Sequence, residues 1–185
     1  MERGEDINNE DITVALLSEQ LAIKRGYTPE KAKQIKFAAM LHDVGKSLLP
    51  HEVLNKPGTL TPAEFEQIKM HTIYGALILS ALPGEAAKLA AVTALLHHEW
   101  INGQGYWGFN ASSLPDFIGI VAICDVYCAL IMRRCYKQAW SHEKAIGYIK
   151  QKSGIQFCPH VVKDFVSMAN EFVNTDFWPP VSICM

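Results

Sequence analysis

Residues 117–132 place the strongest constraint on how this chain of 185 residues can fold. They form a nearly continuous apolar run with Asp125 in its middle. A helix that is apolar around almost its whole circumference is buried on most faces, so other helices must pack around it. An ionised carboxylate there must be paired, hydrogen-bonded or bound to a metal ion. The modest length of the run and its charge favour a buried core helix over a membrane span.

The rest of the chain also shows helical patterns. Ile12, Leu16, Leu17 and Leu21 are apolar at helical spacing, and Thr61-Pro62-Ala63-Glu64 is a capping box. Proline or serine marks most of the other helix starts. The predicted helices cover residues 12–24, 28–42, 61–82, 86–98 and 115–136, a short segment after Ser141, and residues 159–173. Glycines and aromatic residues crowd residues 102–109, which we interpret as a structured, functional loop.

Composition indicates one domain over residues 1–185, with residues 1–10 open to fraying as a terminus. Apolar residues make up 49% of the chain, enough for a sizeable core. The formal net charge is −2, which argues against binding of long nucleic acid. It leaves room for a small anionic ligand held by a few well-placed cations.

The five cysteines include no Cys-x-x-Cys pair, and Cys124 and Cys128 share one helix face, which is poor disulfide geometry. Reduced thiols in a cytoplasmic protein are the better interpretation. The first eleven residues are polar and acidic, unlike a signal peptide. We therefore expect a cytoplasmic protein without a membrane span.

A His-Asp pair, His42-Asp43, follows an apolar helical stretch. Adjacent helical residues point about a quarter-turn apart, so this pair can reach one centre only near a helix end, which Gly45 supplies. A lone buried histidine is more often a hydrogen-bonded core residue than a ligand. The recurrence of ligand types at His71 and at His97-His98, together with Asp125, makes a divalent metal site the better hypothesis.

The motifs resemble the HD-GYP branch of the HD phosphohydrolases, in order and over almost the whole chain. The matching segments are Leu41-His42-Asp43-Val44-Gly45-Lys46, Lys56-Pro57-Gly58, His71-Thr72-Ile73-Tyr74-Gly75, His97-His98-Glu99, Asn102-Gly103-Gln104-Gly105-Tyr106, Asp125-Val126-Tyr127, Arg134-Cys135-Tyr136-Lys137 and Phe157-Cys158-Pro159. The resemblance implies an all-α, single-domain HD-type helical bundle with an extended loop after the His-His-Glu motif.

The resemblance also implies two metal sites that share Asp43 as a bridging ligand. The implied ligands are His42, Asp43 and Asp125 for one site and His71, His97 and His98 for the other. Iron or manganese is the expected metal, with magnesium, nickel or zinc as alternatives. Counting back without gaps places Glu10 where the family usually has a further histidine. Asp6, one turn earlier, would help to hold a third metal; the alternative is that both are solvated acids near a terminus.

Four residues are expected to contact substrate. Lys46 either meets a phosphate oxygen and stabilises developing charge, or is a solvated cation at a helix end. Arg134 and Lys137 match family positions that face the phosphates or guanine of the ligand, and their alternative is a solvated helix end. Tyr106 belongs to the loop that follows the His-His-Glu motif.

Several residues depart from the family pattern. The eponymous Gly-Tyr-Pro is Gly105-Tyr106-Trp107 in this chain. Asn102 and Cys128 each replace a usual aspartate. None of these positions matches a core metal ligand, so metal binding is better supported by the sequence than turnover of one particular substrate.

The leading hypothesis is a metal-dependent phosphodiesterase that hydrolyses a cyclic dinucleotide, cyclic di-GMP, with Asp43 and Lys46 as catalytic groups. The resemblance implies attack of a metal-bridging hydroxide on phosphorus. One alternative is a degenerate module that binds a nucleotide or a signalling-protein partner without turnover. Another is an HD phosphohydrolase with a different nucleotide or phosphate-ester substrate.

Overall fold

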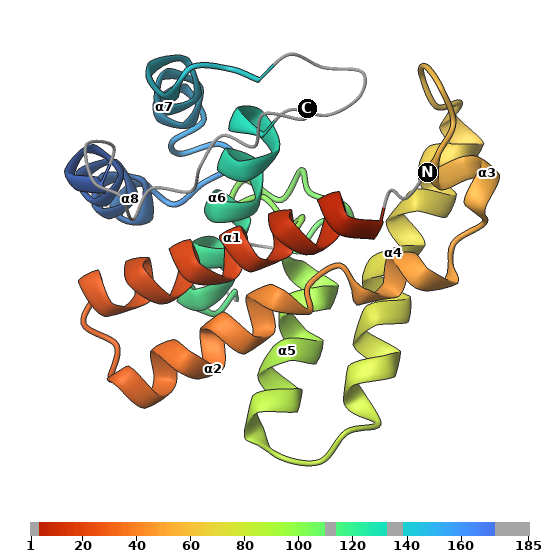
Figure 1. Cartoon of the computed structure of the whole chain (residues 1–185), viewed down its shortest axis with the longest axis horizontal. Coiled ribbons are helices and arrows are strands. Elements are labelled where there is room, and N and C mark those ends of the chain that lie inside the picture. Colours follow the sequence, from red (N-terminus) through yellow and green to blue (C-terminus); the bar gives the residue numbers. More distant parts are fainter. Residues whose placement is uncertain (1–3, 110–113, 133–138, 173–185) are drawn as a thin grey trace.

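The computed structural model describes residues 4–109, 114–132 and 139–172, with side chains from residue 10 onward. This described part is helical and contains no β-strand, which confirms the all-α prediction (Figure 1). Its elements in chain order are α1 (Gly4–Lys24), α2 (Pro29–Met40), the 3₁₀-helix η1 (Val44–Leu48), α3 (His51–Leu54), α4 (Pro62–Ser80), α5 (Glu85–Leu96), α6 (Asp116–Ile131), α7 (His142–Gln151) and α8 (Pro159–Phe172).

The predicted helix starts are confirmed by hydrogen bonds at the caps. The side-chain oxygens of Thr28, Thr61 and Ser141 each accept a hydrogen bond from a backbone N–H in the first turn of α2, α4 and α7. The capping box is complete, because the Glu64 carboxylate also accepts from the backbone N–H of Thr61 at 2.8 Å. These caps satisfy N–H groups that have no partner inside the helix.

Some boundaries differ from the prediction. α1 begins at Gly4 rather than residue 12, α2 ends at Met40, and α6 ends at Ile131, where Met132 takes an extended conformation. The prediction also missed η1 and α3. Both are about one turn long, too short to leave a 3.6-residue pattern in the sequence.

α6 lies at the centre of the packing, behind α1 in the view of Figure 1. It contacts α1, α2, α5, α7 and α8. Its side chains Ile120, Ile123, Cys124, Tyr127 and Cys128 have no solvent exposure, which confirms the predicted buried helix. Among the described helices, none combines the length and apolarity needed to cross a bilayer.

The buried face of α1 is the predicted one only in part, since Leu17 and Leu21 are buried as expected but the other two residues of the pattern are not. Ile12 and Leu16 are 40% and 37% exposed, whereas Val14 and Ala15 are fully buried against the neighbouring helices. The small side chain of Ala15 permits close packing. Because alanine is only weakly hydrophobic, it contributed little to the apolar pattern in the sequence. Glu10 and Asp11 lie one turn before Val14 and Ala15 respectively, so both start near this face. Asp11 is the acid whose carboxylate comes within 4.8 Å of ligand atoms of His42 and Asp43.

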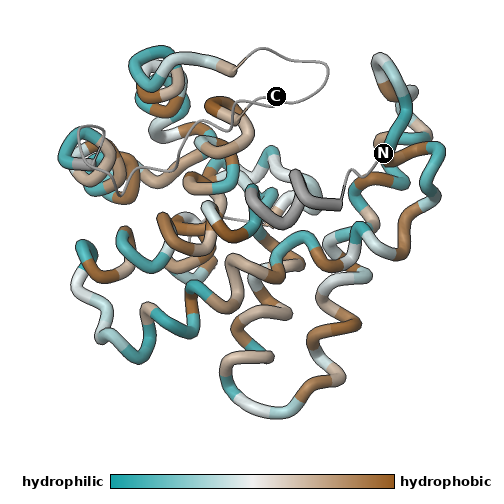
Figure 2. Tube along the Cα trace, in the orientation of Figure 1, coloured by the Kyte–Doolittle hydropathy of each residue, from teal (hydrophilic) through white to brown (hydrophobic). Residues whose placement is uncertain are grey.

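α7 and α8 close the other side of α6. In Figure 2 both helices carry hydrophobic and hydrophilic residues on different sides, as expected for helices that cover a core. Val161 and Phe165 of α8 are buried in that core. The Arg25 guanidinium, 11% exposed, pairs with Asp116 of α6 and Asp164 of α8, and so ties the end of α1 to both helices.

η1 and α4 approach so closely that only glycines fit between them. A Cβ atom added to Gly45 would overlap the backbone of His71 and Gly75. A Cβ on Gly75 would in turn lie 3.1 Å from the Cβ of Ala94 on α5. This contact sets how far Asp43, just before η1, lies from His71 on α4.

Gly45→Ala should therefore destabilise the protein by about 1–3 kcal/mol, the usual cost of overpacking. The matched control is Gly147→Ala in α7, where a Cβ meets nothing within 4 Å. That change should be neutral or stabilising by about 0.5–1 kcal/mol, because alanine favours helix. Urea unfolding of both variants checks the difference, and equal stabilities would contradict the close approach.

Candidate metal centre

The His42-Asp43 pair lies at the break between α2 and η1. α2 ends at Met40, and Asp43 precedes η1 with φ −102° and ψ 6°. The break lets the two adjacent side chains converge, with His42 Nε2 3.3 Å from Asp43 Oδ2. The side chain of His42 is 1% exposed and that of Asp43 is 13% exposed. A charged pair is thus held almost entirely out of water.

Two further helices bring imidazoles to the same carboxylate. His71 on α4 places its Nε2 3.1 Å from Asp43 Oδ1, and His97, which caps the end of α5, places its Nε2 3.7 Å from that oxygen. The ring of His98 lies 4.0 Å from that of His97 and 5.3 Å from that of His71, between centroids. Residues from three separate helical segments therefore meet at Asp43.

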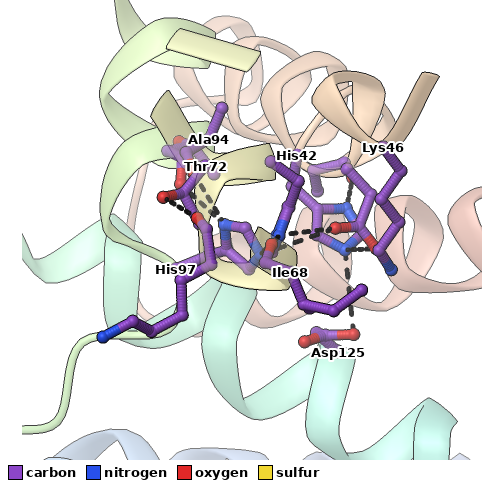
Figure 3. A network of polar contacts seen from close by, with 12 residues as sticks. His42, Lys46, Ile68, Thr72, Ala94, His97 and Asp125 are labelled. Atoms are coloured by element: carbon purple, nitrogen blue, oxygen red, sulfur yellow. Dashed lines mark hydrogen bonds and ion pairs between the residues drawn. The ribbon is translucent and has the colours of Figure 1, made fainter. Parts of the chain in front are cut away.

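Asp125 completes the cluster from α6. Its Oδ1 lies 3.7 Å from His42 Nε2, and Figure 3 shows Asp125 facing His42 across the centre. The described residues offer two ligand groups that share His97, whereas the sequence prediction made Asp43 the shared ligand. One group is Asp43, His71, His97 and His98, and the other is His42, His97 and Asp125. In each group the ligand atoms all lie within 4.8 Å of one another.

The backbone fixes the tautomer of three of these histidines. The Nδ1 atoms of His42 and His71 each lie 2.6 Å from a helix carbonyl oxygen, that of Ala39 and Ile68 respectively. His97 Nδ1 lies 3.0 Å from the Ala94 carbonyl. A carbonyl only accepts, so each Nδ1 carries a proton, and in the neutral ring the Nε2 atom then presents the lone pair. This is the state in which imidazole binds a metal ion.

These lone pairs face one another and require a cation. His71 Nε2 and His97 Nε2 are 3.4 Å apart, although neither has a proton to donate in this tautomer. His42 Nε2 and Asp43 Oδ1 are buried without a hydrogen-bond partner. Buried polar atoms without partners are costly, and a divalent cation among them would satisfy all four. The residues present therefore fit metal ions.

The pKa values show the same demand for positive charge. Burial alone would lower the pKa of His42, but Asp43 and Asp125 outweigh it and raise that pKa well above its usual value. Burial lowers the pKa of His97 well below normal and that of His98 to about 4. Burial acts to raise the pKa of each carboxylate, and the adjacent His42 reverses this effect. Ionised carboxylates beside neutral His97 and His98 are a metal-ligand set.

A third group contains a residue that the sequence analysis missed. Asp11 of α1 has a carboxylate oxygen within 4.8 Å of ligand atoms of His42 and Asp43. Burial raises the pKa of Asp11 to about 6. Glu10 is described but belongs to none of the three groups. The buried register of α1 is the signal that would have found Asp11, since counting back from a family motif fixes a number and not a helix face.

The other predicted site residues have mixed outcomes. Lys46 pairs with Asp43 at the edge of the centre, with 34% of its side chain exposed. The Tyr106 ring packs on His98 at a centroid distance of 4.4 Å. Arg134 and Lys137 lie outside the described residues, and so does the side chain of Asp6.

The helices and this cluster define an all-α domain with a buried centre of histidines and carboxylates that fits metal ions. A family model for the HD domain matches residues 3–161. The chain belongs to the HD-domain family, which confirms the family predicted from the sequence motifs.

The chain is also similar to several proteins of known name. A cyclic di-GMP phosphodiesterase of Thermotoga maritima is 39% identical over 162 residues, which is 87% of this chain and 44% of that protein. The chain thus spans less than half the length of this relative. Bd1817, an HDG"Y"P protein from Bdellovibrio bacteriovorus, superposes with a TM-score of 0.71 and 22% identity, over 92% of this chain and 55% of that one. The HD domain of the Listeria monocytogenes phosphodiesterase PgpH, in complex with cyclic-di-AMP, gives a TM-score of 0.65 and 20% identity, over 92% and 93%.

His71→Ala should weaken manganese binding at the centre by more than the roughly 10–100-fold that outer-shell partners of a metal ligand are worth. The matched control is His51→Ala, because His51 is exposed in α3 and belongs to none of the three groups. Chelator competition and elemental analysis check the prediction. Equal metal affinity in the two variants would contradict the assignment of the cluster.

Proposed function

We propose that this domain is a metal-dependent phosphodiesterase that hydrolyses a cyclic dinucleotide, with cyclic di-GMP as the substrate. The observation that carries the proposal is the pair of Nε2 lone pairs of His71 and His97, 3.4 Å apart beside the shared Asp43 carboxylate. Adjacent metal ions supply an activated water and neutralise charge on a phosphoryl group undergoing in-line attack.

The chain's own residues supply the shape and charge of this reaction. Asp43 would serve both predicted ligand sets, because its two oxygens face different imidazoles: Oδ2 faces His42 and Oδ1 faces His71. Lys46 stands at the partly exposed edge, where its ammonium group can pass from Asp43 to a phosphoryl oxygen as negative charge grows. Burial raises the pKa of Tyr106 to about 12, so its phenol stays neutral and can donate a hydrogen bond to substrate.

The choice of a cyclic dinucleotide is supported by the relatives, one called a cyclic di-GMP phosphodiesterase and another solved with cyclic-di-AMP. A near-neutral chain with a compact site that fits metal cations suits a small anionic ligand better than long nucleic acid. Arg134 and Lys137 are proposed to contact its phosphates or bases. A signalling protein is the proposed partner that would regulate the site.

Iron or manganese is the proposed metal. The cluster mixes imidazole nitrogens with carboxylate oxygens, and such mixed sets suit these ions better than an all-thiolate or all-oxygen set. Asp11 would add a hard oxygen ligand and thereby support a third ion next to His42 and Asp43. We also propose that residues 1–185 act as one domain in the cytoplasm, where the free thiols of Cys124 and Cys128 would stay reduced.

Purified protein loaded with manganese or iron under reducing, anaerobic conditions should hydrolyse cyclic di-GMP. His42→Ala and Asp43→Ala should each reduce the rate below detection, whereas His51→Ala should not. A panel with cyclic-di-AMP and simple phosphate esters separates the substrate classes. Tight binding of cyclic di-GMP without product would favour a non-hydrolysing module, and turnover of simple esters alone would favour another phosphohydrolase.

Asp11 should matter more for metal content than its neighbour. Asp11→Asn should lower the number of manganese ions bound per chain, because the amide is a neutral and weaker ligand. Glu10→Gln provides the matched control for loss of one acid on the same helix, and should leave the number unchanged. Elemental analysis after dialysis measures both, and a loss with Glu10→Gln alone would reverse the assignment.

A further inference from the structure

The loop that follows the His-His-Glu motif is held from inside by a buried carboxylate. Glu99 is 4% exposed, and its two carboxylate oxygens accept backbone hydrogen bonds from Trp107 at 2.7 Å and Phe109 at 2.9 Å. Hydrogen bonds to a charged acceptor are about twice as strong as neutral ones. Glu99 therefore acts as a loop anchor, although its residue type also suits a metal ligand.

The same loop is held from outside by α4. The Trp107 indole Nε1–H donates to Thr72 Oγ1 at 3.0 Å, and the Thr72 hydroxyl in turn donates a hydrogen bond to the Lys69 carbonyl at 2.9 Å. The Lys69 ammonium lies 5.2 Å from the Trp107 ring centroid. Thr72 directly follows His71, so the anchor on α4 is adjacent to a residue of the metal centre.

Gly105 allows the loop to approach the His-His-Glu segment this closely. A Cβ at this position would lie 2.5 Å from Glu99 Cα and 2.6 Å from Trp100 N. These are backbone atoms at distances that real Cβ contacts do not reach, so a side chain would push the loop away. This close approach places Tyr106, the next residue, against the ring of His98.

His98 differs from the other histidines of the centre in how its ring is oriented. His42, His71 and His97 each bond a helix carbonyl through Nδ1. Within the described residues, the recorded contacts of the His98 ring are with other rings, and Tyr106 packs on it at 4.4 Å with a 39° tilt. A metal-binding histidine usually needs an outer partner to fix its ring.

We propose that Trp107 and Glu99 are positioning residues that hold Tyr106 against His98 and thereby orient this histidine for metal binding. The proposal deepens the proposed function, because it rests on His98 being a ligand of the same centre. It also gives the departure from Gly-Tyr-Pro a physical role. A proline at position 107 would lack both the N–H that binds Glu99 and the indole that binds Thr72.

Trp107→Phe and Thr72→Val test the anchor, because the first removes the indole N–H and the second removes the hydroxyl with little change in volume. Each should weaken binding of manganese to the purified protein by roughly 10–100-fold, as loss of an outer-shell partner does. The double variant should be no weaker than either single one, since all three lack the same hydrogen bond. Trp107→Pro should be weaker still. Trp140→Phe is the matched control, because Trp140 packs on Tyr148 and Lys144.

The decisive comparison uses His98→Ala. In that background Trp107→Phe should change manganese affinity no further, whereas a general structural role would lower it again. Circular dichroism of the metal-free variants identifies any that fail to fold. If Trp107→Phe does not fold, Thr72→Val takes its place in the comparison. Wild-type affinity in Trp107→Phe and Thr72→Val, or a full second loss in the His98→Ala background, would overturn the proposal. Because no substrate is used, failure to hydrolyse cyclic di-GMP would leave this result intact.

Discussion

The Asp43 carboxylate lies within 3.7 Å of the Nε2 atoms of His42, His71 and His97. Taking these groups out of water costs several kcal/mol for each ion unless opposite charge compensates. Two of the imidazoles face each other with lone pairs, so they do not provide that charge. The helix ends, the glycine contact and the buried face of α1 all bring polar side chains close to Asp43. Bound cations would supply the positive charge that offsets their burial.

The candidate ligands could be predicted from the sequence because burying polar side chains in apolar helices costs free energy unless they have partners. Asp125 within an apolar helix and His42-Asp43 at the end of another need partners whatever the fold. The capping residues and prolines located most helix starts, because each acts on backbone groups within the first turn of its own helix. What could not be predicted is set by tertiary contacts. The one-turn helices η1 and α3 leave no periodic pattern, and the backbone partners of each Nδ1 depend on where a helix ends.

Asp11 illustrates the limit of motif matching. An ungapped count from the His-Asp pair reaches Glu10, but a difference of one residue rotates a side chain by about 100° around the helix. Which acid faces the centre is then decided by the face that α1 buries. That face contains small and weakly hydrophobic residues such as Ala15, whereas the more obvious Ile12 and Leu16 are partly exposed. Leu17 and Leu21 are buried as the pattern predicted, so hydrophobicity located the buried face only in part.

The departures from the family pattern differ in physical meaning. Cys128, in place of a usual aspartate, is fully buried among apolar residues, where a thiol is far cheaper than a carboxylate. Trp107, in place of proline, makes two hydrogen bonds that proline cannot make. Neither change leaves a buried group unsatisfied. These two substitutions in the family motifs therefore give little reason to regard the metal centre as inactive.

The two predicted ligand sets lie on two groups of helices that contact each other, mainly through α2 and α5 and through η1 and α4. His42, Asp125 and Asp11 come from α1, α2 and α6, which pack on one another, whereas His71, His97 and His98 come from the α4–α5 hairpin (Figure 1). Asp43 stands at their junction, just before the contact of Gly45 with Gly75. A small shift of the hairpin would separate His71 and His97 from Asp43. The backbone contact at these glycines therefore holds the ligand spacing that the proposed two-metal chemistry requires.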